Sequence, residues 1–477
     1  MEKQTKPPET TALPALVPNK ERFHYGLYFF GQNIFYFLQL SFLLIYFSDI
    51  GIPPGTVAIL ILVVKFWDAI NDPIFGGLVD NVRFRSGKFL PWLRISVVAI
   101  PVATLFLFAI PAGLPIYGKV IWAAIGYILW DTAYTICDVP IFGLPTTMTD
   151  RQHERSTLMA IGRLAGSVGS FIIATVVPSF RITISEMLPP VLRDTFGSWL
   201  PVTLLLSLVG FAAMLPICFS ARERIRPAAA EEKIKLRSMV RFVFRNKYLL
   251  IFSIAMIITH AANISGTLMP LFNRIAMGDE GIYAVMAIVG AGPGLAIGIA
   301  VPFILRRIDK FHLYFAALLG SILTTVVSYF VGFDNLVMFY VMSFFRSIFG
   351  SFLATLMFMF TPDCAEYGIY RTGVYATGVA FSVQTFSAKM ISTLSAALSA
   401  GLLALIGFIP GENAVQTSGF ASKAWLILNL IPTIGWILSA FILTRYKLRD
   451  HQVQIMTRCN AGEITREEAE MALAGRR

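Results

Sequence analysis

The run Ile61–Pro73, with the sequence ILVVKFWDAINDP, places two aspartates in the middle of an apolar stretch long enough to cross a bilayer. The run Trp130–Pro140, WDTAYTICDVP, repeats the arrangement with two more. A carboxylate at the centre of a lipid-spanning helix costs roughly 2.5–3.5 kcal/mol even on lenient insertion scales. Acids kept at that cost face a water-filled cavity or a bound cation. The two runs therefore predict an ion or proton pathway.

The composition of the whole chain agrees with a membrane protein. Of its 477 residues, 56% are hydrophobic and 14% are charged, whereas about 25% are charged in soluble proteins. Apolar blocks, each near the ~20 residues that span a bilayer, fall at residues 24–46, 54–80, 92–112, 119–145, 157–178, 199–219, 248–272, 282–305, 311–332, 336–360, 374–407 and 424–445. We expect an all-α membrane protein with twelve transmembrane helices, six on each side of a polar segment.

Basic residues are divided unequally between alternate loops. They gather in the first tail, the central segment, the last tail and the loops between them on the same side, while the opposite loops hold few. Positive-inside bias predicts cytoplasmic tails at 1–23 and 447–477, a cytoplasmic central loop at 220–247, and helical bundles at 24–219 and 248–446. The net charge of +11 follows from this topology and from contact with the anionic bilayer leaflet. Binding to nucleic acid is not needed to explain it.

Six helices on either side of a charged segment predict two six-helix bundles related by a pseudo-two-fold axis. This is the major facilitator architecture, which holds its solute site near the midplane between the bundles. A motif between the second and third spans supports this prediction; its residues are Gly77, Asp80, Arg85, Gly87 and Lys88. We interpret it as a clamp at the bundle ends rather than as a solute site.

The polar residues of the second span share one helix face. Asp68, Asn71 and Asp72 are spaced i, i+3 and i+4. Carboxylates that close in a low dielectric repel each other and need a proton or cation between them. Their hard oxygens suit alkali or alkaline-earth ions, and Pro73 frees a backbone carbonyl nearby. Salt bridges to basic residues are the less favoured alternative, because this span offers only Lys65.

The fourth span repeats the arrangement. Asp131, Thr135 and Asp138 are spaced i, i+4 and i+7 and lie on one face. Tyr134 and Phe142 bring aromatic surface beside Asp138, as in pockets that hold the apolar face of a sugar ring. Each aromatic taken alone is better explained by bundle packing. Beside an intramembrane acid, the aromatic pair favours a ligand pocket.

Basic and polar groups inside other spans are candidate counterparts of these acids. Arg163 lies a turn or two inside the fifth span, and Lys389 lies well inside the eleventh. Arg346 in the tenth span has no evident partner in the sequence. His260 and Asn263 are one turn apart in the seventh span, and we interpret them as a hydrogen-bonded structural pair rather than a proton relay.

Several of these runs resemble one family of transporters. They are Trp67–Ile74 (WDAINDPI), Gly87–Trp92 (GKFLPW), Tyr127–Trp130 (YILW), Tyr134–Pro140 (YTICDVP) and Val383–Lys389 (VQTFSAK). They are similar to the glycoside–pentoside–hexuronide:cation symporters, of which the melibiose permease is the type member. The likeness extends over nearly all of the twelve expected spans. It implies uptake of a sugar, coupled to sodium, lithium or protons, by alternating access.

The resemblance also assigns roles to individual residues. It implies a cation site formed by Asp68, Asn71, Asp72 and Thr135, with Asp68 and Asp72 as the candidate Na⁺ ligands. It implies a solute site that includes Tyr134, Asp138, Arg163, Gln384, Thr385 and Lys389. The chain departs from the family type in the first span, where Gln32 and Asn33 replace a basic–acidic pair. Phe142 replaces a tryptophan that stacks on a galactosyl ring, and Asp131 is an added acid.

We therefore expect a multi-pass inner-membrane importer of a sugar or sugar acid, with Na⁺ or H⁺ as coupling ion and no other cofactor. Because Asn33 removes a negative charge while Arg163 and Lys389 remain, an anionic sugar such as a glucuronide is one hypothesis. The alternative is that Asn33 binds a neutral hydroxyl and Asp131 restores the charge. Rival functions are a symporter of a non-sugar solute such as a lipid, or a membrane enzyme or sensor. An enzyme is disfavoured because the five histidines form no evident catalytic or metal-binding set.

Overall fold

The computed structural model describes residues 17–82, 84, 87–149, 151–187, 189–191, 195, 197–225, 236–374, 377–412 and 414–474. Within these residues the chain is helical apart from its turns and one isolated bridge between Phe84 and Gly87. The N-terminal half contains α1 (Asn19–Asp49), α2 (Pro54–Asn81), α3 (Leu90–Phe108), α4 (Ile116–Met148), α5 (Gln152–Glu186), α7 (Trp199–Met214) and the short α8 (Ile217–Ser220).

The C-terminal half begins after the central segment. It contains α9 (Leu236–Arg245), α10 (Lys247–Ala261), α11 (Ser265–Ala276), α12 (Gly281–Ile304), α13 (Lys310–Val331), α14 (Leu336–Leu356), η1 (Met357–Met359), α15 (Thr361–Thr372), α16 (Thr377–Leu405), α17 (Phe420–Leu443), α18 (Asp450–Asn460) and α19 (Arg466–Ala474). Helix α9 lies within the segment expected to be a loop, and the final tail holds the two helices α18 and α19.

Length and hydropathy qualify eleven helical segments of the described residues as membrane spans. The remaining long helix, α2, has 28 residues but carries Lys65, Asp68 and Asp72 in its middle. Together they make the twelve helices of the major facilitator fold, which confirms the fold class expected from the sequence. The charges that single out α2 are those that form the site described below.

The seventh span is not continuous. Helix α10 ends at Ala261 and α11 begins at Ser265, so the span is interrupted at residues 262–264. The interruption leaves the N-terminus of α11 inside the C-terminal half instead of at a membrane surface. Backbone groups freed in this way persist at membrane depth only where they are buried in protein or line a cavity.

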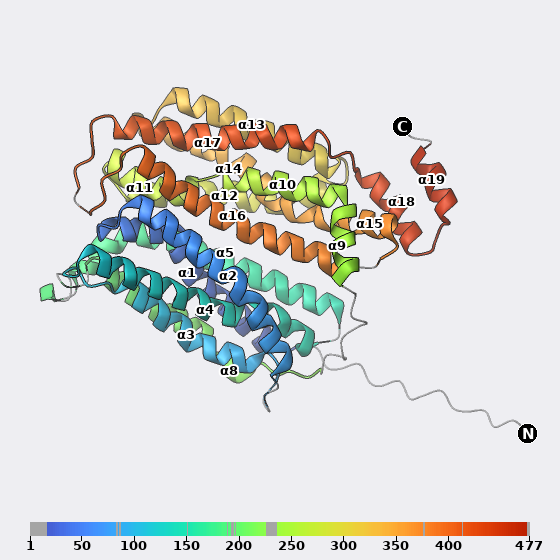
Figure 1. The fold of residues 1–477 in the computed structure, drawn as a ribbon, viewed down its shortest axis with the longest axis horizontal. Helices are drawn as coiled ribbons and strands as arrows, with labels where there is room; N and C mark the ends of the chain where they lie inside the picture. The colour runs from blue at the N-terminus through green and yellow to red at the C-terminus, as the bar shows by residue number, and fades with distance from the viewer. Residues whose placement is uncertain are drawn as a thin grey trace, which may run out of the picture.

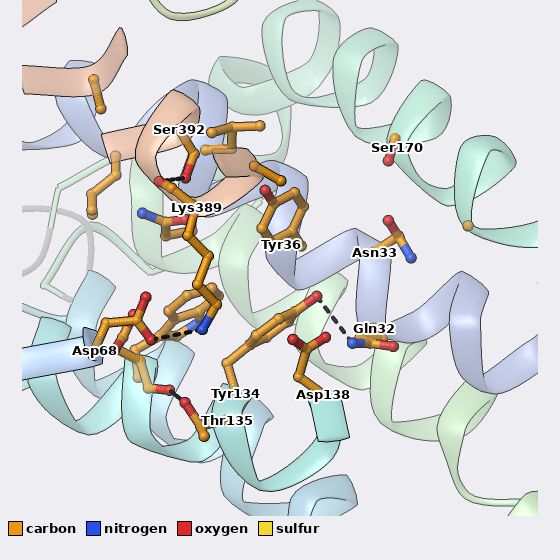
Figure 2. Close-up of a pocket in the computed structure, with 18 of the residues that line it drawn as sticks. Gln32, Asn33, Tyr36, Asp68, Tyr134, Thr135, Asp138, Ser170, Lys389 and Ser392 are labelled. Atoms are coloured by element: carbon orange, nitrogen blue, oxygen red, sulfur yellow. Dashed lines mark hydrogen bonds and ion pairs between the residues drawn. The ribbon is translucent and has the colours of Figure 1, made fainter. Parts of the chain in front are cut away.

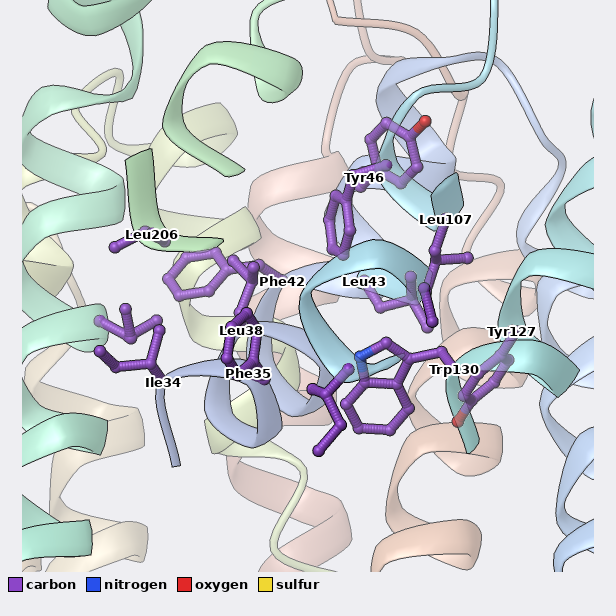
Figure 3. Close-up of a cluster of buried hydrophobic side chains, with 14 of the residues drawn as sticks. Ile34, Phe35, Leu38, Phe42, Leu43, Tyr46, Leu107, Tyr127, Trp130 and Leu206 are labelled. Carbon is purple, nitrogen blue, oxygen red and sulfur yellow. The ribbon is translucent and has the colours of Figure 1, made fainter. Parts of the chain in front are cut away.

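The two halves lie side by side, with the N-terminal helices below and the C-terminal helices above in the view of Figure 1. Helix α2 packs against α16, and α5 packs against α12. Inside the N-terminal half, α1 contacts α5 and α7, and buried residues such as Phe35, Leu38 and Trp130 form its core (Figure 3). Glycine permits the close approach: a Cβ at Gly169 of α5 would lie 2.5 Å from the carbonyl oxygen of Phe30.

Candidate functional site

A cavity of about 560 Å³ lies between the two halves and is lined by residues of α1, α2, α4, α5, α11 and α16. Pockets of this size hold small solutes. The expected site residues that line it are Asn33, Asp68, Tyr134, Thr135, Asp138, Phe142, Arg163, Thr385 and Lys389. Asn71, Asp72 and Gln384 do not line it, although Asp72 contacts two residues that do. Figure 2 shows the polar side chains converging from α1, α2, α4 and α16.

The carboxylates of α2 are paired with a lysine from the opposite half. Lys389 Nζ lies 3.4 Å from Asp68 Oδ1 and also forms an ion pair with Asp72. Lys65 Nζ lies 3.4 Å from Asp68 Oδ2, one helical turn away. Salt bridges, the less favoured alternative in the sequence, are thus present at both acids. Their principal partner, Lys389, comes from α16 and is separated from Asp68 by 321 positions.

The additional acid of α4 belongs to the same cluster. Asp131 Oδ1 accepts a hydrogen bond from Lys65 Nζ at 3.0 Å, and Asp131 is 4% exposed. Lys65 therefore lies between Asp68 and Asp131. The i, i+3 spacing of Lys65 and Asp68 was a signal in the sequence for the pair within α2, whereas nothing in the sequence indicated the pair with Asp131.

The charges of this cluster do not balance. Its three carboxylates are Asp68, Asp72 and Asp131, and its two ammonium groups are Lys65 and Lys389. One negative charge is left over when all five groups are ionised. In a low-dielectric setting such a charge draws in a proton or a monovalent cation.

A threonine connects the acids of α2 to helix α4. Thr135 Oγ1 lies 3.3 Å from Asp72 Oδ1 and 3.1 Å from the carbonyl oxygen of Asp131. Asn71, 8% exposed, has a buried side-chain Nδ2 without a hydrogen-bond partner. The four expected cation-site residues are thus gathered where α2 meets α4. An oxygen-rich environment of this kind suits an alkali cation.

The expected solute-binding groups are available for binding. Among the described residues, none donates a hydrogen bond to Asp138, which lies beside Tyr134 and Gln32 in Figure 2. Gln32 Nε2 donates to the Tyr134 hydroxyl at 3.0 Å. Asn33 Nδ2 donates to the Phe29 carbonyl at 2.9 Å, which leaves its side-chain oxygen free to accept.

Arg163 on α5 has no acidic partner in the described part of the chain. Its guanidinium lies 5.8 Å from the ring of Phe358, which belongs to the opposite half. Phe142 packs edge-on against Phe29, with ring centroids 5.4 Å apart. Both side chains line the cavity, so an unpaired cation and an aromatic ring are presented to whatever occupies it.

Helix α16 contributes residues at helical spacing. Thr385, Lys389 and Ser392 line the cavity. Gln384 has a buried Oε1 without a hydrogen-bond partner. Sequence reasoning missed other lining residues, notably Tyr36 and Gln39 of α1. Their polar groups were not visible as part of a site because α1 has no charged residue between Arg22 and Asp49 other than the ionisable His24.

The end of the bundle-end motif contacts the central segment. The carboxylate of Glu223 accepts hydrogen bonds from the backbone amides of Lys88, Phe89 and Leu90 at 2.8–2.9 Å. Arg85 and the side chain of Asp80 lie outside the described residues. In the seventh span, the backbone amide of Asn263 donates to the backbone carbonyl of His260, and His260 Nε2 is buried without a partner.

One end of the molecule holds ion pairs that cross between the halves. We call it the far end, defined by Asp49, Arg181, Arg274, Glu280 and Glu412. Arg181 of the N-terminal half lies 2.7 Å from both Glu280 and Glu412 of the C-terminal half. Arg274 reaches back to Asp49 at 2.5 Å. These contacts join the two halves at the far end.

The other end holds α9, α18, α19 and the start of α1, and we call it the tail end (Figure 1). Its ion pairs, in the described part of the chain, join groups of the same half. Arg22 pairs with Glu154 at 2.9 Å, and Arg224 pairs with Glu21. Lys310 pairs with Asp363 at 2.5 Å and with Asp450 at 3.3 Å.

Two helical bundles around a polar central cavity, joined by ion pairs at one end, define a membrane transporter of the major facilitator type. A family model described as MFS/sugar transport protein matches residues 24–450. The chain belongs to this family of multi-pass membrane transporters.

Curated relatives cover nearly the whole chain. An uncharacterized symporter, YjmB of Bacillus subtilis, is 29% identical over 91% of this chain and 93% of its own length. The isoprimeverose transporter of Lactiplantibacillus pentosus is 24% identical over 91% and 89%. The glucuronide carrier protein homolog of Escherichia coli is 26% identical over 91% and 94%.

Solved structures show the same fold. The nucleoside transporter NupG matches with a TM-score of 0.62 at 13% identity, over 90% of this chain and all of the matched chain. A D-xylose–proton symporter matches with a TM-score of 0.61 at 12% identity, over 88% and 96%. At these identities the likeness concerns the fold alone.

Proposed function

We propose that this protein imports a sugar or sugar acid across the inner membrane by symport with one Na⁺ or H⁺, through alternating access. The charge balance of the central cluster is the observation that carries the proposal. Three carboxylates against two lysines leave room for one monovalent cation. The solute crosses unchanged, so the protein is a transporter and not an enzyme. The positive-inside rule supports a cytoplasmic position of the basic tail end.

A shared helix supplies the coupling. Thr135 contacts Asp72 at 3.3 Å, and Asp138 lies one turn along the same helix and lines the cavity. A cation held by Asp72 and Thr135 would therefore position the helix that carries a solute-binding group. Such coupling is reciprocal: each ligand raises the affinity of the other by the same factor.

The decisive variant is Asp72→Asn. It removes one carboxylate, so the cluster becomes neutral without a bound cation. We expect loss of cation-driven accumulation, with exchange of internal for external sugar retained. Uptake of labelled sugar into empty vesicles measures accumulation, and release of label from vesicles preloaded with labelled sugar measures exchange. Concentrative uptake that survives in this variant contradicts the assignment of the cation site.

We further propose that the solute is a sugar acid. Arg163 is a cavity-lining cation without an acidic partner in the described residues, and guanidinium groups bind carboxylates in a bidentate manner. The relatives support this choice, since one is named a glucuronide carrier homolog. The proposal predicts that unlabelled glucuronides compete for uptake far better than the matching neutral glucosides. Equal or reversed potency would favour a neutral sugar.

Charge movement gives an independent readout. A sugar acid with one monovalent cation carries no net charge across the membrane, whereas a neutral sugar with one cation carries one. A membrane potential should therefore leave the initial uptake rate of a glucuronide unchanged. A strong dependence on the potential would contradict the combination of an anionic solute with a single cation.

A further inference from the structure

A second arginine lies inside the membrane region, away from the central cavity. Arg346 is near the middle of α14, which runs from Leu336 to Leu356. Its guanidinium donates to Asn429 Oδ1 at 3.2 Å and to Ser265 Oγ at 3.4 Å. Both acceptors are neutral, and no acid of the described residues pairs with it. The five N–H donors of the Arg346 guanidinium thus have two acceptors. At this depth in the membrane, a charged side chain costs several kcal/mol.

The arginine opens into a cavity of its own. This cavity has a volume of about 380 Å³ and is lined by residues of α11, α12, α13, α14 and α17. None of its described lining residues is acidic, and many carry hydroxyl groups. Ser321 and Thr325, 2% and 0% exposed, line it with hydroxyls that have no hydrogen-bond partner. Buried hydroxyls normally have a partner, so these donors await an acceptor that the protein does not provide.

The interrupted seventh span adds to the positive character of the cavity. Helix α11 begins at Ser265, and both Ser265 and Gly266 line the cavity. The amides of Thr267 and Leu268 in this first turn donate to the carbonyl of Ile264, and the turn carries the positive end of the helix dipole. The arginine and the free hydroxyls are donors, and the helix N-terminus adds positive potential, so an anion suits all three.

We propose that this cavity is a second binding site, specific for a small solute that carries an oxyanion group. The oxyanion lies on Arg346 and the first turn of α11, and Ser321 and Thr325 donate to it or to hydroxyls of the solute. Trp425 and Trp436 also line the cavity and supply aromatic surface for a ring. The cavity has room for a sugar acid or for an inorganic oxyanion, which share this chemistry. The proposal does not depend on which solute the central cavity carries.

The two tryptophans provide a reporter. Purified protein is titrated with inorganic phosphate, with glucuronate and with neutral methyl glucoside while tryptophan fluorescence is followed. We expect a saturable change with at least one anion and none with the neutral sugar at equal concentration. A response to both anions identifies a site for sugar acids, whereas a response to phosphate alone identifies a site for inorganic oxyanions.

Variants locate the response. Arg346→Gln should weaken the anion response at least tenfold, and Trp425→Phe should reduce its amplitude. All titrations are also made with Trp130→Phe, which removes the tryptophan of the central cavity. The anion response that remains in this variant is the one assigned to Arg346. If Arg346→Gln does not fold, Thr325→Val replaces it, with an expected loss of severalfold in affinity. An anion response that is absent in the wild type, unchanged in these variants, or lost with Trp130→Phe overturns the proposal.

Discussion

Both ends of the molecule hold ion pairs, but the two ends use them differently. At the far end, Arg181 and Arg274 connect one half to the other. At the tail end, the ion pairs of the described residues stay within a half, as between Arg22 and Glu154. The comparison indicates that the far end is a closed gate, while the tail end consists of two separately braced bundles that can part.

The central cluster, like the far end, contains ion pairs that join the two halves. Lys389 of α16 pairs with Asp68 and Asp72 of α2 and so connects the halves at membrane depth. Lys65 and Asp131, in contrast, form a pair within one half. Alternating access requires the contacts between halves to break and re-form, while the contacts within a half persist. The following predictions test this division.

The largest effect is expected at the far-end gate. Arg181 is 2% exposed and lies within ion-pair distance of three acids, and removing one member of a buried pair costs about 3–5 kcal/mol. Arg181→Met should shift the population toward a far end that is open. A cysteine at Ala396, which lines the central cavity, should then react with an impermeant thiol reagent applied from the far side.

The matched control is Arg22→Gln at the tail end. Its partner, Glu154, belongs to the same half, so far-side labelling of the Ala396 cysteine should stay low. Both variants are made without Cys459, the one cysteine that is not buried. Equal labelling in the two variants would remove the distinction between the ends.

The next largest effect is expected on transport when the Lys65–Asp131 pair within the N-terminal half is broken. Lys65→Met leaves Asp131 and Asp68 without their shared counter-ion, at a cost of about 2 kcal/mol or more, or roughly 30-fold in uptake. The double variant Lys65→Met with Asp131→Asn restores the net charge of the cluster and should recover most of the lost transport. Cation-dependent uptake in the single and double variants measures this. A double variant as inactive as the single one would show that the pair does more than balance charge.

A smaller effect is expected for Lys389→Gln. Lys389 is 34% exposed, so the contribution of its ion pairs is reduced by solvent screening to about 1 kcal/mol. Losing this cation from the cluster should strengthen cation binding while weakening coupling to the solute. Calorimetric titration of Na⁺ in the presence and absence of sugar measures both. If Na⁺ affinity falls instead, Lys389 does not compete with the cation.

The smallest effect is a pH dependence of the gate. Burial opposes ionisation of Glu412, but its hydrogen bond with Arg181 prevails and lowers the pKa of its carboxyl below the usual value. The stabilisation it gives is therefore present at neutral pH and is lost as the pH falls through the lowered pKa. Acidifying the far side should increase labelling of the Ala396 cysteine, and Glu412→Gln should raise labelling at neutral pH and abolish its pH dependence.

The sequence predicted the fold well because hydropathy and basic-residue bias are strong signals for membrane helices. Helical spacing also placed Asp68 and Asp72 on one face of the second span, and Thr135 and Asp138 on one face of the fourth. The sequence joined Thr135 to the acids of the second span only through the family resemblance.

The sequence did not predict that Lys65 and Lys389 would occupy the acidic cluster. Pairing between α2 and α16 depends on how the halves pack, which periodicity does not report. The far-end cluster was missed for the same reason: its members come from five separate segments of the chain.

The interruption of α10 and α11 was also hidden. The residues between His260 and Gly266 include no proline, so the sequence predicts one continuous helix for this span. Arg346 was recognised as an unpartnered charge, but the cavity around it exists only through packing of five helices.

The central claim is that one monovalent cation drives accumulation of the solute. Proteoliposomes with an imposed Na⁺ gradient, a proton gradient or neither are given labelled glucuronide, and the internal concentration is followed. We predict accumulation above the external concentration with one of the two gradients, its loss in Asp72→Asn, and a flux ratio of one cation to one sugar. Uptake that only equilibrates the two sides under every gradient would contradict the account.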